Sequence, residues 1–72
     1  MMKGGEYMPS YRIAYCVSRD GSMHAETDEI CEISAQHAVD HLKRLIDDGE
    51  EIRVVNVWVL RGGRWEIVEG WE

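Results

Sequence analysis

Residues 54–72 read VVNVWVLRGGRWEIVEGWE, and this stretch decides the fold. Two segments rich in valine and tryptophan flank Gly62 and Gly63, and a glycine pair in this position predicts a two-residue hairpin turn. Such a turn places four cross-strand pairs on one face of the hairpin: Leu60 with Trp65, Trp58 with Ile67, Asn56 with Glu69, and Val54 with Trp71. The opposite face carries Val55, Val57, Val59 and Val68, along with Arg61, Arg64 and Glu66. Both faces are therefore apolar in the middle.

A helix is predicted before this hairpin, over residues 35–48. Apolar residues recur there at the three-and-four spacing of an amphipathic helix, at Ala35, Ala38, Val39, Leu42, Leu45 and Ile46. Ser34 is a suitable N-cap, and Gly49 is a suitable residue for the C-terminal end. The apolar stripe is narrow and begins with two alanines, so it needs bulky partners.

The first strand is predicted from Ser10, where YRIAYCVS alternates with the period of a strand. One side carries Tyr11, Ile13, Tyr15 and Val17, and the other carries Arg12, Ala14, Cys16 and Ser18. The Asp20-Gly21 pair that follows predicts a hairpin into a second strand.

Two loop lengths are possible in this first hairpin, and they give different registers. A two-residue loop at Asp20 and Gly21 places Tyr15 beside Glu26 and Ile13 beside Asp28, which mixes apolar and acidic side chains. A three-residue loop of residues 19–21 gives other pairs: Val17 with Met23, Tyr15 with Ala25, and Ile13 with Thr27. We expect the three-residue loop because it collects the apolar residues on one face. His24, Glu26 and Asp28 then point outward.

These elements predict an α+β fold with ββαββ order, in which one helix packs on one face of a four-stranded, largely antiparallel sheet. With 72 residues the chain can build one hydrophobic core, so residues 10–72 are expected to form one domain. Residues 1–9 contain Gly4, Gly5 and Pro9 without apolar periodicity, and they are expected to form a flexible N-terminal arm.

A single helix covers only one side of such a sheet, so one face of the second hairpin remains for solvent or a partner. We expect the tryptophan face to be the core, because it has six apolar residues against four and its large rings complement the small helix alanines. The opposite face would then be exposed beside Ala14 and Cys16. It is either an interface or an ordinary surface of strand-forming residues, and the residues concerned are Val55, Val57, Val59 and Val68.

The net charge of −6 disfavours direct binding to nucleic acid, whose affinity for proteins comes from Lys and Arg. An acidic chain favours basic partners, although the charge can also serve solubility alone. Two acidic clusters can present carboxylates to a groove rich in arginine or lysine. Their residues are Glu26, Asp28, Glu29, Asp47, Asp48, Glu50 and Glu51.

No catalytic, cofactor or metal site is predicted. His37 and His41 lie on one side of the helix, but no third and fourth metal ligands accompany them. Cys16 and Cys31 lack the CxxC spacing of a redox or zinc site and are expected to be free thiols, buried or half-buried. No apolar run approaches the roughly 18 residues of a membrane span, and the N-terminus lacks a secretory signal, so a cytoplasmic protein is expected.

The ββαββ order, the acidic second strand and the Trp-rich final hairpin resemble small phage-encoded proteins of the anti-CRISPR type. The resemblance implies a non-enzymatic inhibitor that binds a basic surface of a host nucleic-acid-handling complex. It also implies that the carboxylates of the two acidic clusters make this contact. The alternative is a small structural homodimer that associates through the valine face or along an edge strand of its sheet.

Overall fold

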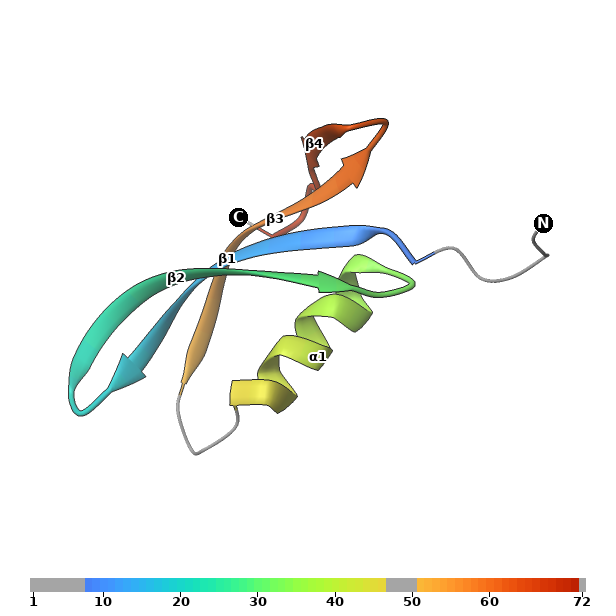
Figure 1. Ribbon diagram of the computed structural model, residues 1–72. Coiled ribbons are helices and arrows are strands. Elements are labelled where there is room, and N and C mark those ends of the chain that lie inside the picture. The colour runs from blue at the N-terminus through green and yellow to red at the C-terminus, as the bar shows by residue number, and fades with distance from the viewer. Residues whose placement is uncertain (1–7, 47–50, 72) are drawn as a thin grey trace.

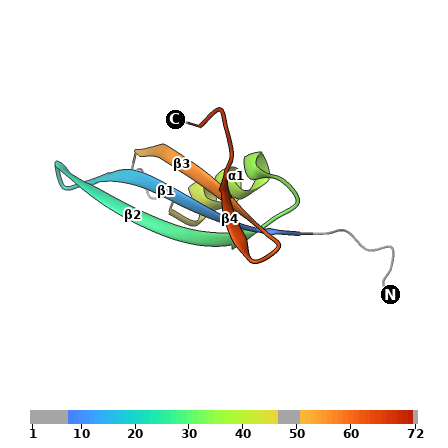
Figure 2. The ribbon, with the colours of Figure 1, turned by 90° about the horizontal axis from the view of Figure 1, so that it is seen from above.

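A computed structural model describes residues 8–46 and 51–71 of the chain (Figure 1). Its elements are β1 (Ser10–Arg19), β2 (Ser22–Cys31), α1 (Ala35–Ile46), β3 (Ile52–Arg61) and β4 (Arg64–Ile67). The strands form one antiparallel sheet in the order β2-β1-β3-β4, and α1 packs on one face of it (Figure 2). The predicted α+β fold is confirmed. Most of the predicted N-terminal arm, residues 1–7, lies outside the described residues.

β1 supplies the centre of the core. Its four alternating apolar residues are buried beneath α1, as their spacing predicts, and they are Tyr11, Ile13, Tyr15 and Val17. They meet the apolar stripe of α1, in which Ala38, Val39 and Leu42 are buried. β1 lies between β2 and β3 in the sheet, so both hairpins are built on this strand.

The N-terminus of α1 is capped as predicted. The backbone N–H of His37 donates to Oγ of Ser34 at 3.2 Å, and the N–H of Ala38 donates to the Ser34 carbonyl at 3.0 Å. The helix is described as far as Ile46. The last predicted helical residues, 47–48, and the predicted stop at Gly49 lie outside the described residues.

The expected register of the first hairpin is wrong. The loop has two residues, Asp20 and Gly21, so Tyr15 pairs with Glu26 and Ile13 pairs with Asp28. Both loop residues have positive φ, 50° and 79°, which is the geometry that lets a two-residue turn match the twist of its strands. Glu26 and Asp28 therefore lie on the α1 side of the sheet and do not point away from it, contrary to expectation.

The second hairpin turns at Gly62 and Gly63, as predicted, with φ values of 57° and 78°. The expected pairs nearest the turn are present, namely Leu60 with Trp65 and Trp58 with Ile67. β4 ends at Ile67, so the expected pairs of Asn56 with Glu69 and Val54 with Trp71 do not form as part of the ladder. After β4 the chain leaves the sheet, and Val68 and Trp71 pack against the core.

A bulge at Val55 changes which side chains of β3 face the helix. Ala14 pairs with Asn56, but the next residue of β1, Tyr15, pairs with Val54, so Val55 has no partner on β1. On one side of the bulge Val57 and Val59 point into the core, and on the other side Ile52 and Val54 pack against it. Odd-numbered and even-numbered residues of one strand thereby reach the same layer.

The expectation that the tryptophan face forms the core is therefore wrong. Val57 and Val59 are 0% and 3% exposed, whereas Trp58 and Trp65 are half-buried on the opposite side. The rings of Tyr11 and Tyr15 already fill the space beneath α1 that the expectation assigned to the indoles. Short β-branched side chains on β3 then complete the layer.

The predicted valine interface does not exist as a surface. Val57 and Val59 are core residues, and Val68 packs against the core, half-buried. Only Val55, at the bulge, is exposed among the four, with 41% of its surface accessible. An interface on the uncovered side of the sheet has to be built from other residues.

Candidate functional site

The face of the sheet opposite α1, here called the uncovered face, carries the largest exposed apolar side chains of the strands. Met23 and Ile67 are 64% and 51% exposed, and the half-buried Trp58 and Trp65 lie on the same face as Ile67. Val55 joins them at the bulge. Exposed apolar residues that share one face of a small protein are characteristic of an interaction surface.

Two charges on the uncovered face, those of Arg12 and Glu29, compensate each other. The guanidinium of Arg12 lies 4.2 Å from the centre of the Trp65 ring, in the geometry of a cation–π contact. It also donates to Oε2 of Glu29, from Nη2 at 2.9 Å and from Nε at 3.3 Å. One cation thus connects β2, β1 and β4 across this face, and the pair adds no net charge to it.

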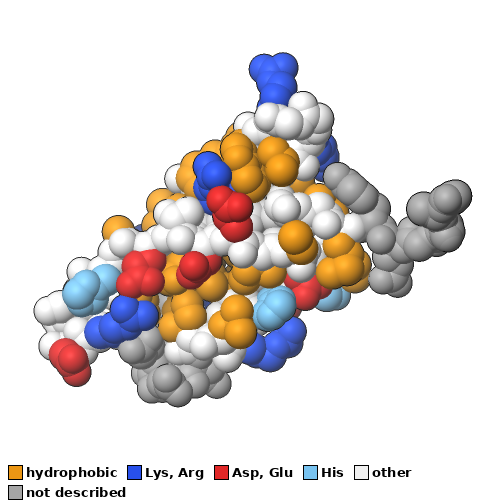
Figure 3. Space-filling model, viewed as in Figure 1, with side chains coloured by type: hydrophobic (Ala, Val, Ile, Leu, Met, Phe, Trp, Pro, Cys, Tyr) orange, Lys and Arg blue, Asp and Glu red, His pale blue; other side chains and the backbone are white. Residues whose placement is uncertain are grey.

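The acidic residues of β2 divide between the two faces of the sheet. Glu29 lies on the uncovered face, whereas Glu26 and Asp28 lie on the α1 side of the sheet. Figure 3 shows acidic side chains among apolar ones along the part of the surface that Figure 1 assigns to β2. The β2 edge of the sheet therefore presents carboxylates in both directions.

Tyr15 ties this acidic pair to the core. Its hydroxyl lies 2.6 Å from Oδ2 of Asp28 and 3.2 Å from Oε1 of Glu26, and Arg19 donates to the other Glu26 oxygen at 2.8 Å. Burial of the Tyr15 ring raises the pKa of its hydroxyl, and the hydrogen bonds and negative charges of the two carboxylates raise it further. The phenol consequently stays protonated and remains a donor to the carboxylates.

The predicted acidic residues do not gather into one described site. Glu26 and Asp28 are neighbours, and Glu29 is on the opposite face. Glu51 is exposed before β3, where its carbonyl accepts a hydrogen bond from the N–H of Ser18 at 3.1 Å. Three predicted members lie outside the described residues: Asp47, Asp48 and Glu50.

The two helix histidines make local contacts. Nδ1 of His37 lies 2.7 Å from the hydroxyl of Ser34, and Nδ1 of His41 lies 3.1 Å from Oε2 of Glu32. The Glu32 contact joins α1 to the segment that follows β2. Among the described residues, no three His, Cys, Asp or Glu side chains are grouped as metal ligands.

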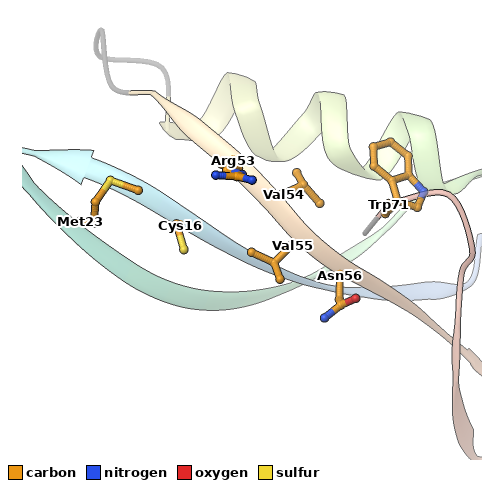
Figure 4. Close-up of a pocket in the computed structure, with 7 residues that line it drawn as sticks. All are labelled: Cys16, Met23, Arg53, Val54, Val55, Asn56 and Trp71. Carbon is orange, nitrogen blue, oxygen red and sulfur yellow. The ribbon is translucent and has the colours of Figure 1, made fainter.

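A groove runs along β3 beside the bulge. It encloses about 460 Å³, is lined by Cys16, Met23, Arg53, Val54, Val55 and Asn56, and is bounded at one end by Trp71. Figure 4 shows Val54 directed toward α1 and Trp71, with Val55 and Asn56 directed to the other side of the strand. A second hollow of about 300 Å³ shares Cys16, Met23 and Arg53 and reaches Glu51. The two hollows follow β3 over residues 51–56.

Sequence reasoning missed Arg12, Tyr15 and Trp65 as site residues. The alternation of β1 places Arg12 on the face opposite Tyr15, but the partners of both depend on the register of the first hairpin. The Asp20-Gly21 pair was the available signal, because Asp-Gly favours a two-residue turn. Both cysteines are free thiols, as expected; Cys16 is half-buried, but Cys31 is exposed, contrary to the expectation.

The chain matches no known family model, no curated protein and no solved structure. The part of the chain that the structure describes contains no helix long and apolar enough to cross a membrane. A functional proposal for this protein therefore rests on the two faces and the edges of its sheet.

Proposed function

We propose that the protein is a non-enzymatic interaction module that binds a basic protein surface. The observation that carries the proposal is the uncovered face of the sheet, on which Met23, Ile67 and the two indoles remain accessible. Half-buried tryptophans with an arginine beside them are the residue types that dominate binding energy in protein interfaces.

The negative charge of the chain favours a basic protein as the partner. The chain has a net charge of −6, and the β2 edge carries Glu29 on the uncovered face and Glu26 and Asp28 on the α1 side. A partner with lysines and arginines around an apolar patch would gain from both contacts, and the negative field of the module would accelerate its approach. Proteins that handle nucleic acid present such surfaces to phosphate.

A more specific form of this proposal is that the protein is a phage-encoded inhibitor of a CRISPR-type complex. The resemblance in element order and acidity supports this form. Such an inhibitor would act in the cytoplasm, so we propose a cytoplasmic location as well. A binding role is favoured over catalysis because a chain of 72 residues has little material from which to build a deep catalytic cleft.

The test is capture of a partner from a bacterial lysate by the immobilised chain, at about 0.05 M and about 0.5 M salt. We expect a basic protein to bind at low salt and to be largely lost at high salt, because screening weakens contacts between surface charges. The variant Ile67→Glu introduces a charge at an exposed position of the uncovered face and should abolish capture.

Lys43→Gln is the matched control, because it makes the net charge more negative by the same amount on an exposed position of α1. It should leave capture unchanged. Equal capture by the Ile67→Glu variant, or equal capture at both salt concentrations, would contradict the proposal.

A further inference from the structure

The β3 side of the sheet has an open edge. β4 pairs with β3 only over Trp58–Arg61, and the N–H of Val68 adds one bond to the carbonyl of Val57 at 2.8 Å. Residues 52–56 have β1 on one side. No described strand lies on the other side, where Trp71 of the segment after β4 lies near Val54 (Figures 2 and 4). An unpaired strand edge is a template for another strand.

The direction of the backbone groups on this edge follows from two hydrogen bonds. The carbonyl of Glu51 accepts from Ser18 of β1, so Glu51 points its backbone groups toward β1. Because successive residues of a strand direct these groups to alternate sides, Ile52 and Val54 point theirs toward the open edge. The Val57 carbonyl also points away from β1, since it accepts from Val68. Regular alternation would direct it toward β1, and the extra residue of the bulge at Val55 reverses the alternation.

The open edge is self-complementary. In an antiparallel pair of two copies related by a two-fold axis at Arg53, Ile52 of each copy lies opposite Val54 of the other. All the edge-directed N–H and C=O groups of these two residues then find partners, which gives four hydrogen bonds. An axis at Val54 would pair that residue with itself alone and would run the partner strand into the bulge.

The side chains of this edge suit the same alignment. Ile52 and Val54 of both copies stay on the α1 side, where they already pack against the core. On the other side, Val55 lies opposite Glu51 of the second copy. The two Arg53 side chains lie opposite each other, and each is diagonal to Glu51 of the other copy, whose carboxylate offsets the like charge. No contact of Arg53 with another charged group is present among the described residues, so its guanidinium is available to this carboxylate.

The other edge of the sheet is acidic, which disfavours self-pairing. On β2, a two-fold axis at Thr27 would place Glu26 of one copy opposite Asp28 of the other, and like charges directly opposite are destabilising. In a pair joined at β3 these acidic strands lie at the two outer ends of the combined sheet. The distribution of charge thus favours β3 as the edge that meets a second copy.

We infer that the chain forms a two-fold homodimer in which the open edges of β3 pair over residues 51–55 and extend the sheet across both copies. The groove beside β3 then receives side chains of the second copy, next to Val55 and Met23. This inference goes beyond the proposed binding function, because it uses the edge and leaves the uncovered face free.

The test compares two variants at Val55, which is exposed enough to accept a charge without loss of the fold. The dimer dissociation constant is measured for the full chain by sedimentation equilibrium. Val55→Lys places a cation opposite Glu51 of the second copy and should lower the constant. Val55→Glu places like charges opposite each other and should raise it. Each dimer contains two symmetry-related contacts between residue 55 and Glu51, so each variant should change the dimer dissociation constant by about twofold to thirtyfold.

Combining Val55→Glu with Glu51→Lys replaces the like charges of the Val55→Glu variant by opposite charges and should lower the dissociation constant again, toward that of the wild type. In the wild type, the amides of Ile52 and Val54 should exchange more slowly with solvent as concentration rises, since they become bonded in the dimer. Ile67→Glu, which tests the uncovered face, should leave the dimer unchanged.

A chain that stays monomeric at millimolar concentration would overturn the inference. An equal response to Val55→Lys and Val55→Glu would overturn it as well. A dimer that Ile67→Glu disrupts and the Val55 variants do not would show that two copies meet through the uncovered face instead. Failure to capture a basic partner concerns only the proposed function, because none of these measurements involves that partner.

Discussion

The hydroxyl of Tyr15 meets the carboxylate of Asp28 at 2.6 Å, across the first hairpin and at the rim of the core. The ring of Tyr15 is 2% exposed, so this bond joins a core residue to an acidic residue of an edge strand. It also shows why the two-residue register is stable although it places carboxylates on the apolar side of β2. The Tyr15 hydroxyl donates to the carboxylates on this side of the sheet, and the Tyr15 ring packs in the apolar core.

Removing this hydroxyl should destabilise the fold. Tyr15→Phe keeps the ring but removes the hydrogen bond to Asp28, an exposed carboxylate that water can then solvate, and we expect unfolding to become easier by about 0.5–1.5 kcal/mol. The measurement is urea denaturation at neutral pH. Tyr11→Phe is the matched control, because Tyr11 is also a buried ring of β1 but no hydrogen bond of its hydroxyl is present among the described residues. A similar loss in both variants would contradict the role given to the Asp28 bond.

Stability should fall at alkaline pH through the same group. Burial first, and the two carboxylates next, raise the pKa of Tyr15 above its ordinary value of 10.0. As pH rises past that value, the unfolded chain releases a proton that the folded chain retains, so ionisation favours unfolding. The free energy of unfolding should therefore drop between about pH 9 and about pH 11 more steeply for the wild type than for Tyr15→Phe. Parallel curves for the two proteins would contradict this assignment.

The core face can be tested with two valines on either side of the bulge. Val57→Ala removes two buried methyl groups beneath α1 and should cost about 2 kcal/mol, whereas Val55→Ala, at a site that is 41% exposed, should change stability by less than about 0.5 kcal/mol. Thermal and urea denaturation measure both. Val57→Glu should prevent folding, since it would bury an unpaired charge. Equal costs for the two alanine variants would mean that the bulge is misplaced.

The sequence predicts the elements of this protein better than their faces. The period of β1, the Ser34 cap and the Gly62-Gly63 turn each depend on neighbouring residues, and all three are confirmed. The bulge at Val55 depends on how β3 meets β1, which are distant in sequence. Because a bulge reverses the alternation of a strand, regular alternation across it gave the wrong core face and hence the wrong interface valines.

The candidate surfaces could likewise be predicted only as far as they depend on neighbouring residues in the sequence. The acidity of β2 and the presence of exposed apolar residues could be read from composition and spacing. The partners of the individual carboxylates could not, because they follow from the register of the first hairpin. Glu29 has Arg12 as its partner and Asp28 has Tyr15, on opposite faces of the same strand.

The contact between Arg12 and Trp65 should be measurable as a coupling energy. The guanidinium is planar and lies 4.2 Å from the ring centre while it bonds Glu29 through two nitrogens, a geometry that a lysine cannot reproduce. Arg12→Lys should therefore cost about 0.5–1 kcal/mol, a modest value because the pair is partly exposed to solvent. A double-mutant cycle with Trp65→Leu should return most of that loss as coupling. A second cycle with Glu29→Gln separates the ion pair from the ring contact, and it should lose its coupling at high salt while the first cycle keeps most of its own. No coupling between Arg12 and Trp65 would mean that the indole is held on the uncovered face by Leu60 and its other neighbours alone.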